Sequence, residues 1–250
     1  MKKITVALLL AFATANAYAQ QYTTVFGLQY KPIVPSAFFR NDGFAKLDEL
    51  HDINLKASTG SSLGAVVRRG ISKRFSVEGG INMVNRNYNL TVRSLDTNQT
   101  FEQNFKWLSY EIPIQTMVFV QLGTKTYLNA AAGASFNFFP SDIEGQNDFF
   151  YQRTFRQGWL RTALTANLGF EYRTESSGFL YLGASYMQPF SSMAQTTVFQ
   201  RDNLKNFSTE SFRGNYLTID LRYYFHADPN PVTKSKLRKY RKQKKKASQP

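Results

Sequence analysis

The sequence of 250 residues contains no cysteine, only two histidines, and no apolar run long enough for a membrane-spanning helix. Without cysteine there is no disulfide, no thiolate nucleophile and no lipid anchor on a cysteine. A spanning helix needs about 20 apolar residues, so a chain of this composition could enter a membrane only as a closed sheet, in which every backbone amide has a partner. Two histidines also leave little material for a catalytic triad or a metal site.

The first residues have the pattern of a secretion signal. Lys2 and Lys3 precede an apolar stretch from Ile4 to Ala15, and Ala17–Ala19 offers small residues around a cleavage point. We therefore expect residues 1–19 to be a signal peptide that is removed before Gln20, so that the protein is exported.

Positive charge is concentrated at the C-terminus. The formal net charge is +14, yet residues 20–226 carry 20 Lys and Arg against 16 Asp and Glu, whereas residues 227–250 carry nine against one. Export argues against nucleic acid as a partner of this charge. We expect 227–250 to be a basic, disordered periplasmic tail. It is either a solvated arm or a tether to an anionic lipid, acidic protein or cell-wall polymer. Its basic residues are Lys234, Lys236, Arg238, Lys239, Arg241, Lys242, Lys244, Lys245 and Lys246.

Between signal and tail, apolar and polar side chains alternate in eight segments. A period of two over eight segments predicts eight β-strands, because successive side chains of a strand point to opposite faces. The predicted strands are Tyr22–Lys31, Ser61–Ser72, Phe75–Arg86, Lys106–Gln121, Tyr127–Phe138, Trp159–Arg173, Leu180–Tyr186 and Leu217–Phe225.

The connections between these segments alternate in length. Short turns at 73–74, 122–126 and 174–177 alternate with long polar connections at Pro32–Gly60, Asn89–Phe105, Pro140–Gly158 and Pro189–Arg213. Outer-membrane barrels have short periplasmic turns and long outer loops. The sequence therefore predicts, for residues 20–226, an all-β, eight-stranded antiparallel transmembrane up-and-down β-barrel with periplasmic termini, in the outer membrane of a Gram-negative-type cell.

Periodicity alone leaves the direction of the apolar face open. A secreted soluble barrel with an apolar lumen and a polar exterior would show the same alternation. Two features favour lipid outside: aromatic residues tend to end the apolar faces, and the polar faces combine ionic groups with small residues. The outer-membrane lipid is therefore an expected partner.

The ionic groups of the polar faces are the candidate functional residues. They are Arg68, Glu78, Arg86, Glu111, Arg161, Glu171, Arg173, Asp220 and Arg222. Because an unpaired buried ion is very costly, we expect them to pair as a network that fills the narrow lumen. The alternative is a polar conduit or gate, with Arg86, Glu111 and Arg161 toward the outside and Arg68, Glu78, Glu171 and Arg222 toward the periplasm.

The run Tyr110-Glu111-Ile112-Pro113-Ile114 resembles the Tyr-(Leu)-Glu-Ile-Pro-Leu segment of PorT-like outer-membrane β-barrel proteins. Residues 26–31 and 221–225 also resemble the first and the last strand of that family. The resemblance implies an eight-stranded barrel in the outer membrane. Some members of the family serve protein secretion through the type IX pathway, and most have no assigned role. The tail after Phe225 departs from the family pattern, because such barrels usually stop near a terminal aromatic.

Four local features carry further expectations. Pro113 cannot donate to a strand ladder, which predicts a local bulge. The first long connection is expected to hold a short helix near Phe44–Leu55. His51 lies beside acidic residues in that connection, where a solvated charge cluster is favoured over a weak metal site. The aromatics Phe149, Phe150, Tyr151 and Phe155 would make the third connection a contact surface.

These observations favour a non-enzymatic protein without cofactor. Neither His51 nor His226 has a persuasive serine partner, so no catalytic set is visible. The leading hypothesis is an anchor or accessory of an envelope complex, with protein export as one such role and an envelope protein as partner. A narrow passive channel comes second and an outer-membrane enzyme third.

Overall fold

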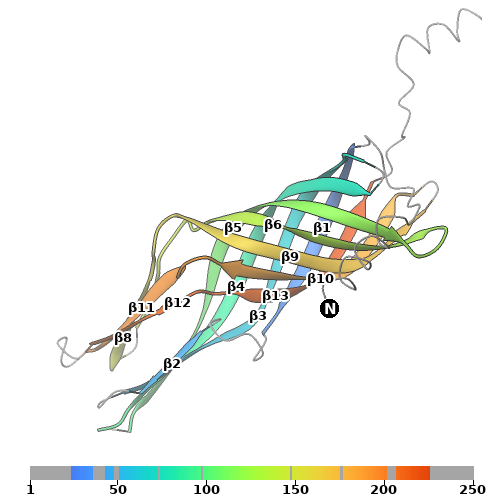
Figure 1. The fold of residues 1–250 in the computed structure, drawn as a ribbon. Coiled ribbons are helices and arrows are strands. Elements are labelled where there is room, and N and C mark those ends of the chain that lie inside the picture. Colours follow the sequence, from blue (N-terminus) through green and yellow to red (C-terminus); the bar gives the residue numbers. More distant parts are fainter. Residues whose placement is uncertain are drawn as a thin grey trace, which may run out of the picture.

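The computed structural model describes residues 24–35, 43–47, 51–72, 74–96, 98–146, 148–174, 177–201 and 207–225 (Figure 1). The predicted signal peptide (1–19), the basic tail (227–250) and His226 lie outside the described residues. The regular elements within these ranges are all strands, and no helix there is long and apolar enough to cross a membrane.

Eight strands form a closed antiparallel barrel. Strand β1 pairs with both β13 and β3, which closes the order β1-β13-β10-β9-β6-β5-β4-β3 into a ring. The predicted fold, an eight-stranded up-and-down barrel, is confirmed. The strands are β1 (Thr24–Val34), β3 (His51–Gly70), β4 (Phe75–Ser94), β5 (Thr100–Gln121), β6 (Thr126–Phe138), β9 (Leu160–Arg173), β10 (Phe179–Pro189) and β13 (Tyr216–Tyr224).

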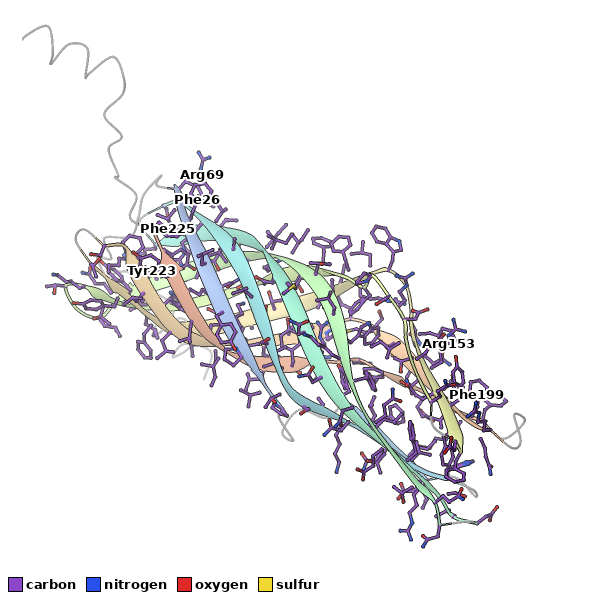
Figure 2. All side chains as sticks on the ribbon, turned by 180° about the vertical axis from the view of Figure 1, so that it is seen from behind. Phe26, Arg69, Arg153, Phe199, Tyr223 and Phe225 are labelled. Atoms are coloured by element: carbon purple, nitrogen blue, oxygen red, sulfur yellow. The ribbon has the colours of Figure 1, made fainter. Side chains whose placement is uncertain are left out.

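The turn after β3, the start of β1 and the end of β13 lie at the same end of the barrel. The turn after β3 is closed by the backbone N–H of Ile71, which donates to the carbonyl of Phe75 at 2.9 Å. Thr24 pairs with Arg69 beside this turn, and Gly27 pairs with Tyr224 near the end of β13. Figure 2 shows Phe26, Arg69, Tyr223 and Phe225 at this end of the molecule.

The sequence had suggested that the long connections are loops, but the structure shows that they contain strands. Strands β3, β4 and β5 continue far beyond the barrel, and five further strands are added: β2 (Phe44–Leu47), β7 (Ile143–Gln146), β8 (Phe150–Arg156), β11 (Ala194–Gln200) and β12 (Phe207–Phe212). β2 joins the extended β3, while β12-β11-β8-β7 form a second sheet. Contacts place β12 beside β2 and β7 beside β5. The alternation of apolar and polar side chains continues through these connections, so each of the two sheets has one apolar face. The two sheets pack through these faces as a two-layer sandwich.

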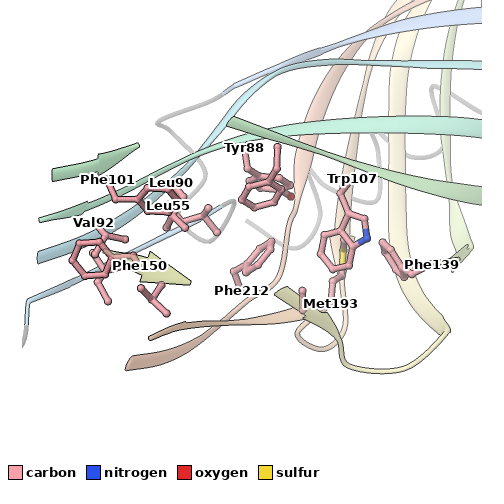
Figure 3. Packing of buried hydrophobic residues seen from close by; sticks show 14 of the residues in the cluster. Leu55, Tyr88, Leu90, Val92, Phe101, Trp107, Phe139, Phe150, Met193 and Phe212 are labelled. Carbon is pink, nitrogen blue, oxygen red and sulfur yellow. The ribbon is translucent and has the colours of Figure 1, made fainter. Parts of the chain in front are cut away.

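The sandwich has an apolar core of its own. It joins Ile53, Leu55, Leu90, Val92 and Phe101 from the extended barrel strands to residues of the second sheet. Figure 3 shows how these layers pack. The remaining buried members are Tyr88, Phe105, Trp107, Phe139, Phe150, Ala163, Met187, Met193, Ala194, Val198 and Phe212. Burial of each large side chain stabilises the sandwich by about 1.5–3 kcal/mol.

Two local predictions are wrong. The segment expected to be a helix, 44–55, is strand wherever it is described, because Ile53 and Leu55 alternate with polar residues rather than recurring every third or fourth position. No register shift occurs at Pro113: it pairs with Ser135 in an uninterrupted β5–β6 ladder, and on its other side the β4–β5 pairing is interrupted between Gly79–Ile114 and Asn82–Glu111 without a change of register. A register shift occurs instead between Ser58 and Ser61, where the β3–β4 register slips by one residue.

The outside of the barrel is apolar. Leu164, Leu168 and Leu182 are more than half exposed, as are others on the same faces. From Leu160 to Tyr172, β9 extends about 40 Å at roughly 3.3 Å per residue, and a tilt of about 45° reduces this to about 28 Å. That height suits the hydrocarbon core of a bilayer, about 30 Å thick. The soluble alternative, with apolar side chains inside, is therefore wrong.

Candidate functional site

The charged residues of the lumen form one continuous chain near the end with the tight turns. Arg173 bonds Glu171 at 2.6 Å, and the other oxygen of Glu171 accepts from Arg68. Arg68 Nε donates to Glu78 at 3.1 Å, and Glu78 also accepts from Arg222. Positive and negative groups alternate along this path, so each carboxylate lies between two guanidinium groups. Such pairing offsets the cost of burying the ions.

The chain continues from Arg222 to Asp220 and ends at Lys31. Asp220 Oδ2 accepts a hydrogen bond from Arg222 and lies 3.4 Å from Lys31 Nζ. The same carboxylate also accepts from Asn167 at 2.9 Å, from Ser185 at 2.5 Å and from Thr218 at 2.6 Å. Both oxygens of this buried carboxylate are thus engaged, Oδ2 by several donors and Oδ1 by Thr218, which compensates for the water that burial removes.

Aromatic rings pack against the guanidinium groups of this chain. The Arg68 guanidinium lies 3.9 Å from the centre of the Tyr224 ring, and the Arg173 guanidinium lies 3.9 Å from that of Tyr127. The Tyr224 hydroxyl also donates to Glu78. Cation–π contacts of this kind are stronger where water is excluded. Together the rings and ions fill the lumen of a small barrel with side chains.

A second polar layer lies closer to the sandwich. Arg86 donates to Ser109 and, at 3.3 Å, to Asn137, while its guanidinium lies 4.9 Å from the Tyr216 ring centre. Tyr216 in turn donates to Glu111 at 2.7 Å. Arg86 and Glu111 are therefore joined through a tyrosine. Above them Trp107 and Phe139, whose ring centres are 5.1 Å apart, begin the apolar core of the sandwich.

Of the nine charged residues singled out in the sequence, the structure brings six into one chain: Arg68, Glu78, Glu171, Arg173, Asp220 and Arg222. Arg86 and Glu111 form the second layer. Arg161 joins neither; it lies at the outer rim of the barrel and donates to Ser191 at 3.2 Å. Sequence reasoning missed Lys31, although Lys31 shares the inward face of β1 with Gln29 and alternates with the exposed Tyr30.

Burial distinguishes a filled lumen from a conduit. Arg68, Glu171 and Asp220 are 0 % exposed, and Glu78 and Arg222 are below 5 %. The walls of a water-filled pore would be exposed to solvent, whereas these charges are in contact with one another. The described lumen therefore contains a closed ionic layer, capped on the sandwich side by aromatic residues.

The acidic surroundings of His51 had suggested a solvated cluster or a weak metal site. Instead His51 is buried in the sandwich, and its ring meets Phe150 edge-on at 5.8 Å. Asp48 and Glu49 lie outside the described residues. No group of three or more histidine or acidic side chains suited to a metal ion occurs in the part of the chain that the structure describes.

The outer face of the second sheet carries a row of aromatic side chains. Phe199 on β11 pairs with Tyr151 on β8 and with Phe207 on β12, and the ring centres are 6.0 and 5.9 Å apart. Phe207 is 60 % exposed. Beside this row Arg153 stacks on Phe155 at 4.3 Å. Of the aromatics predicted to form a contact surface, Phe150 is buried, while Phe149 is 41 % exposed.

No family model and no curated protein matches the chain. Its structure resembles that of the outer membrane protein OprG from Pseudomonas aeruginosa, with a TM-score of 0.53 and 13% sequence identity over 84% of this chain and 100% of that chain. Weaker matches are the outer membrane protease OmpT from Escherichia coli (0.32, 10%, 81% and 96%) and the beta domain of the Bordetella autotransporter BrkA (0.33, 6%, 82% and 98%). The likeness to OprG establishes the fold: an outer-membrane β-barrel.

Proposed function

We propose that the protein is a non-enzymatic anchor or accessory of an envelope complex, held in the outer membrane by its barrel after the signal peptide is removed. The observation that carries this proposal is the combination of a sealed lumen with a packed sandwich beyond the barrel. The barrel supplies attachment, and the sandwich supplies a rigid surface outside the membrane. Type IX-like protein secretion, which the resemblance to PorT-like proteins suggests, is the specific complex we favour.

The closed ionic layer supports an anchor over a passive channel. An ion that moved through this layer would have to separate Arg68 from Glu78 and Glu171, all of them buried. Breaking a buried pair costs about 3–5 kcal/mol. The same contacts tie β3, β4 and β9 together and so stabilise the barrel wall.

The aromatic row of Tyr151, Phe199 and Phe207 is the surface that we assign to a protein partner. Exposed aromatic residues beside arginine are enriched at protein interfaces, where they supply much of the binding energy. Three rings on three adjacent strands form a continuous patch rather than scattered exposed residues. Their position at the far end of the sandwich, where Figure 2 labels Phe199, makes them accessible to a partner outside the membrane.

The basic tail is a second attachment in this proposal. Each lysine or arginine close to an anionic surface contributes about 1 kcal/mol, an effect that salt screens. Deletion of residues 234–250 should therefore weaken association with vesicles that contain anionic lipid, chiefly at low salt. Equal binding by the full and the shortened chain would remove the tether from the proposal.

The partner surface is tested by crosslinking in intact cells, followed by identification of the proteins that copurify. The same crosslinked partner should be recovered with the unaltered protein and with the control Leu47→Thr, which changes an exposed apolar residue of the other sheet. It should be lost with the double variant Phe199→Thr/Phe207→Thr. Recovery that is equal for all three proteins, or a steady single-channel current from the purified barrel in a planar bilayer, would contradict the proposal.

A further inference from the structure

A groove lies on the solvent face of the sandwich sheet made by β3, β4 and β5. Its volume is about 470 Å³, within the range of small-molecule sites. Leu90 is the one apolar residue among those that line it. The others are Asp52, Asn54, Lys56, Asn89, Thr91, Arg93, Thr100, Glu102 and Asn104.

The strand register arranges these nine polar side chains in three rows of three. Each row takes one residue from each strand, and successive rows are two residues apart. The rows are Asp52, Arg93 and Thr100; Asn54, Thr91 and Glu102; Lys56, Asn89 and Asn104. Strand spacing and the two-residue repeat give the array a size of about 10 Å by about 14 Å. The array could therefore contact an extended ligand about 14 Å long.

The polar groups of the array are available to a ligand. Within the described part of the chain, no side-chain hydrogen bond or ion pair joins these nine residues to one another. Arg93 is held from outside the array by Asn98, which accepts two of its hydrogen bonds at 2.9 and 2.5 Å. Asn98 adopts a positive φ of 52° at the tip of the β4–β5 hairpin, so the turn positions Arg93 at one end of the groove.

The chemistry of the array excludes several ligand classes. Two acidic and two basic residues balance in charge, which suits neither an anionic polymer nor a metal cation. The aromatic anchors that a peptide partner would require are absent from the lining, in contrast with the opposite face of the sandwich. What remains is a dense set of amides, hydroxyls and balanced charges, which both donate and accept hydrogen bonds.

We propose that this groove binds a neutral oligosaccharide of about two to three sugar units. A sugar hydroxyl is at once donor and acceptor, and the amides of Asn54, Asn89 and Asn104 match that property. Thr91 and Glu102 lie in the middle row, where a ligand would contact both. This site goes beyond the proposed anchor role and lies on the face opposite the aromatic row. The same chemistry could come from the cell's own surface polysaccharide or from a soluble glycan.

The test uses the full chain, purified and reconstituted in lipid discs. Binding is measured by fluorescence polarisation with labelled neutral trisaccharides, with neutral polysaccharide extracted from the surface of the producing cell, with a heparin oligosaccharide and with an extended neutral peptide. The groove variant is Asn54→Val/Thr91→Val, which keeps strand-forming residues while removing central hydrogen-bonding groups. The matched control, Gln195→Val/Thr209→Val, makes the equivalent change on the solvent face of the other sheet.

We expect a neutral glycan to bind the unaltered protein and the control equally, and to bind the groove variant at least about tenfold more weakly, since two hydrogen bonds of about 1 kcal/mol each are lost. A preference for the extracted polysaccharide identifies the cell's own surface as the source, and a preference for a trisaccharide identifies a soluble glycan. Binding of heparin or peptide alone, equal loss in both variants, or no glycan binding would each overturn the proposal. Crosslinking to an envelope partner is unaffected by these outcomes, so the two proposals fail separately.

Discussion

Glu78 joins two arginines at the middle of the ionic chain, and Glu78→Gln should destabilise the barrel strongly. The change keeps the size of the side chain but removes the charge that lies between Arg68 and Arg222. Each arginine keeps one carboxylate, Glu171 or Asp220, so the loss should fall near the low end of the range for broken buried ion pairs, about 3 kcal/mol. Against a total stability of about 5–15 kcal/mol this is a large fraction.

The assay is equilibrium unfolding in urea of the protein folded into lipid vesicles, followed by the fluorescence of its two tryptophans. Trp107 is buried in the sandwich and Trp159 is 64 % exposed at the barrel rim, so together they report on both parts. The matched control is Glu144→Gln. Glu144 bonds Arg153 at 2.7 Å, but both side chains are at least 40 % exposed, and such pairs contribute about 0–1 kcal/mol. Equal loss of stability in the two variants would refute the claim that the buried ion pairs of the lumen stabilise the barrel more than exposed pairs do.

Two further perturbations address packing. Trp107→Ala removes the largest fully buried side chain of the sandwich and should cost about 3–5 kcal/mol of its stability. Proteases should then digest the sandwich faster while the barrel stays folded, and digestion at the unaltered rate would contradict the packed core. Gly64→Ala would place a methyl group 2.3 Å from the carbonyl oxygen of Ile81, which should cost about 1–3 kcal/mol, whereas Gly123→Ala has nothing within 4 Å and should be neutral. Equal unfolding midpoints for the two alanine variants would contradict the register of β3 and β4.

The barrel could be predicted from the sequence because its signal is local. In β9 large apolar residues alternate with small or polar ones, as in Leu164-Thr165 and Leu168-Gly169, and only the backbone pleat is needed to assign their faces. The same alternation predicts that the ionic residues point inward. It does not predict which of them pair, because Arg68 and Glu171 are 103 residues apart and only the closed ring of strands brings them together.

The sandwich was missed although its signal is of the same kind. In the connection at 89–105, Leu90, Val92 and Phe101 alternate with asparagine, threonine and charged residues, which favoured the interpretation as a polar loop. His51 was misplaced for a related reason. Its acidic neighbours suggested solvent, whereas its spacing from Ile53 puts it on the buried face of β3. In both predictions the polar composition of the segment was given more weight than the alternation of its apolar residues.

The central claim is that leucines cover the outside of a cylinder whose middle is ionic and closed to water. The chain has no cysteine, so single-cysteine variants report on one position each. In lipid vesicles, Leu168→Cys should resist a water-soluble thiol reagent and, when spin-labelled, should respond to lipid-dissolved oxygen. Ser135→Cys, on the buried inner face, should resist the reagent as well, while Leu47→Cys, at a position of the sandwich that is 73 % exposed, should react quickly. Reaction of Leu168→Cys or Ser135→Cys as fast as that of Leu47→Cys would contradict the account.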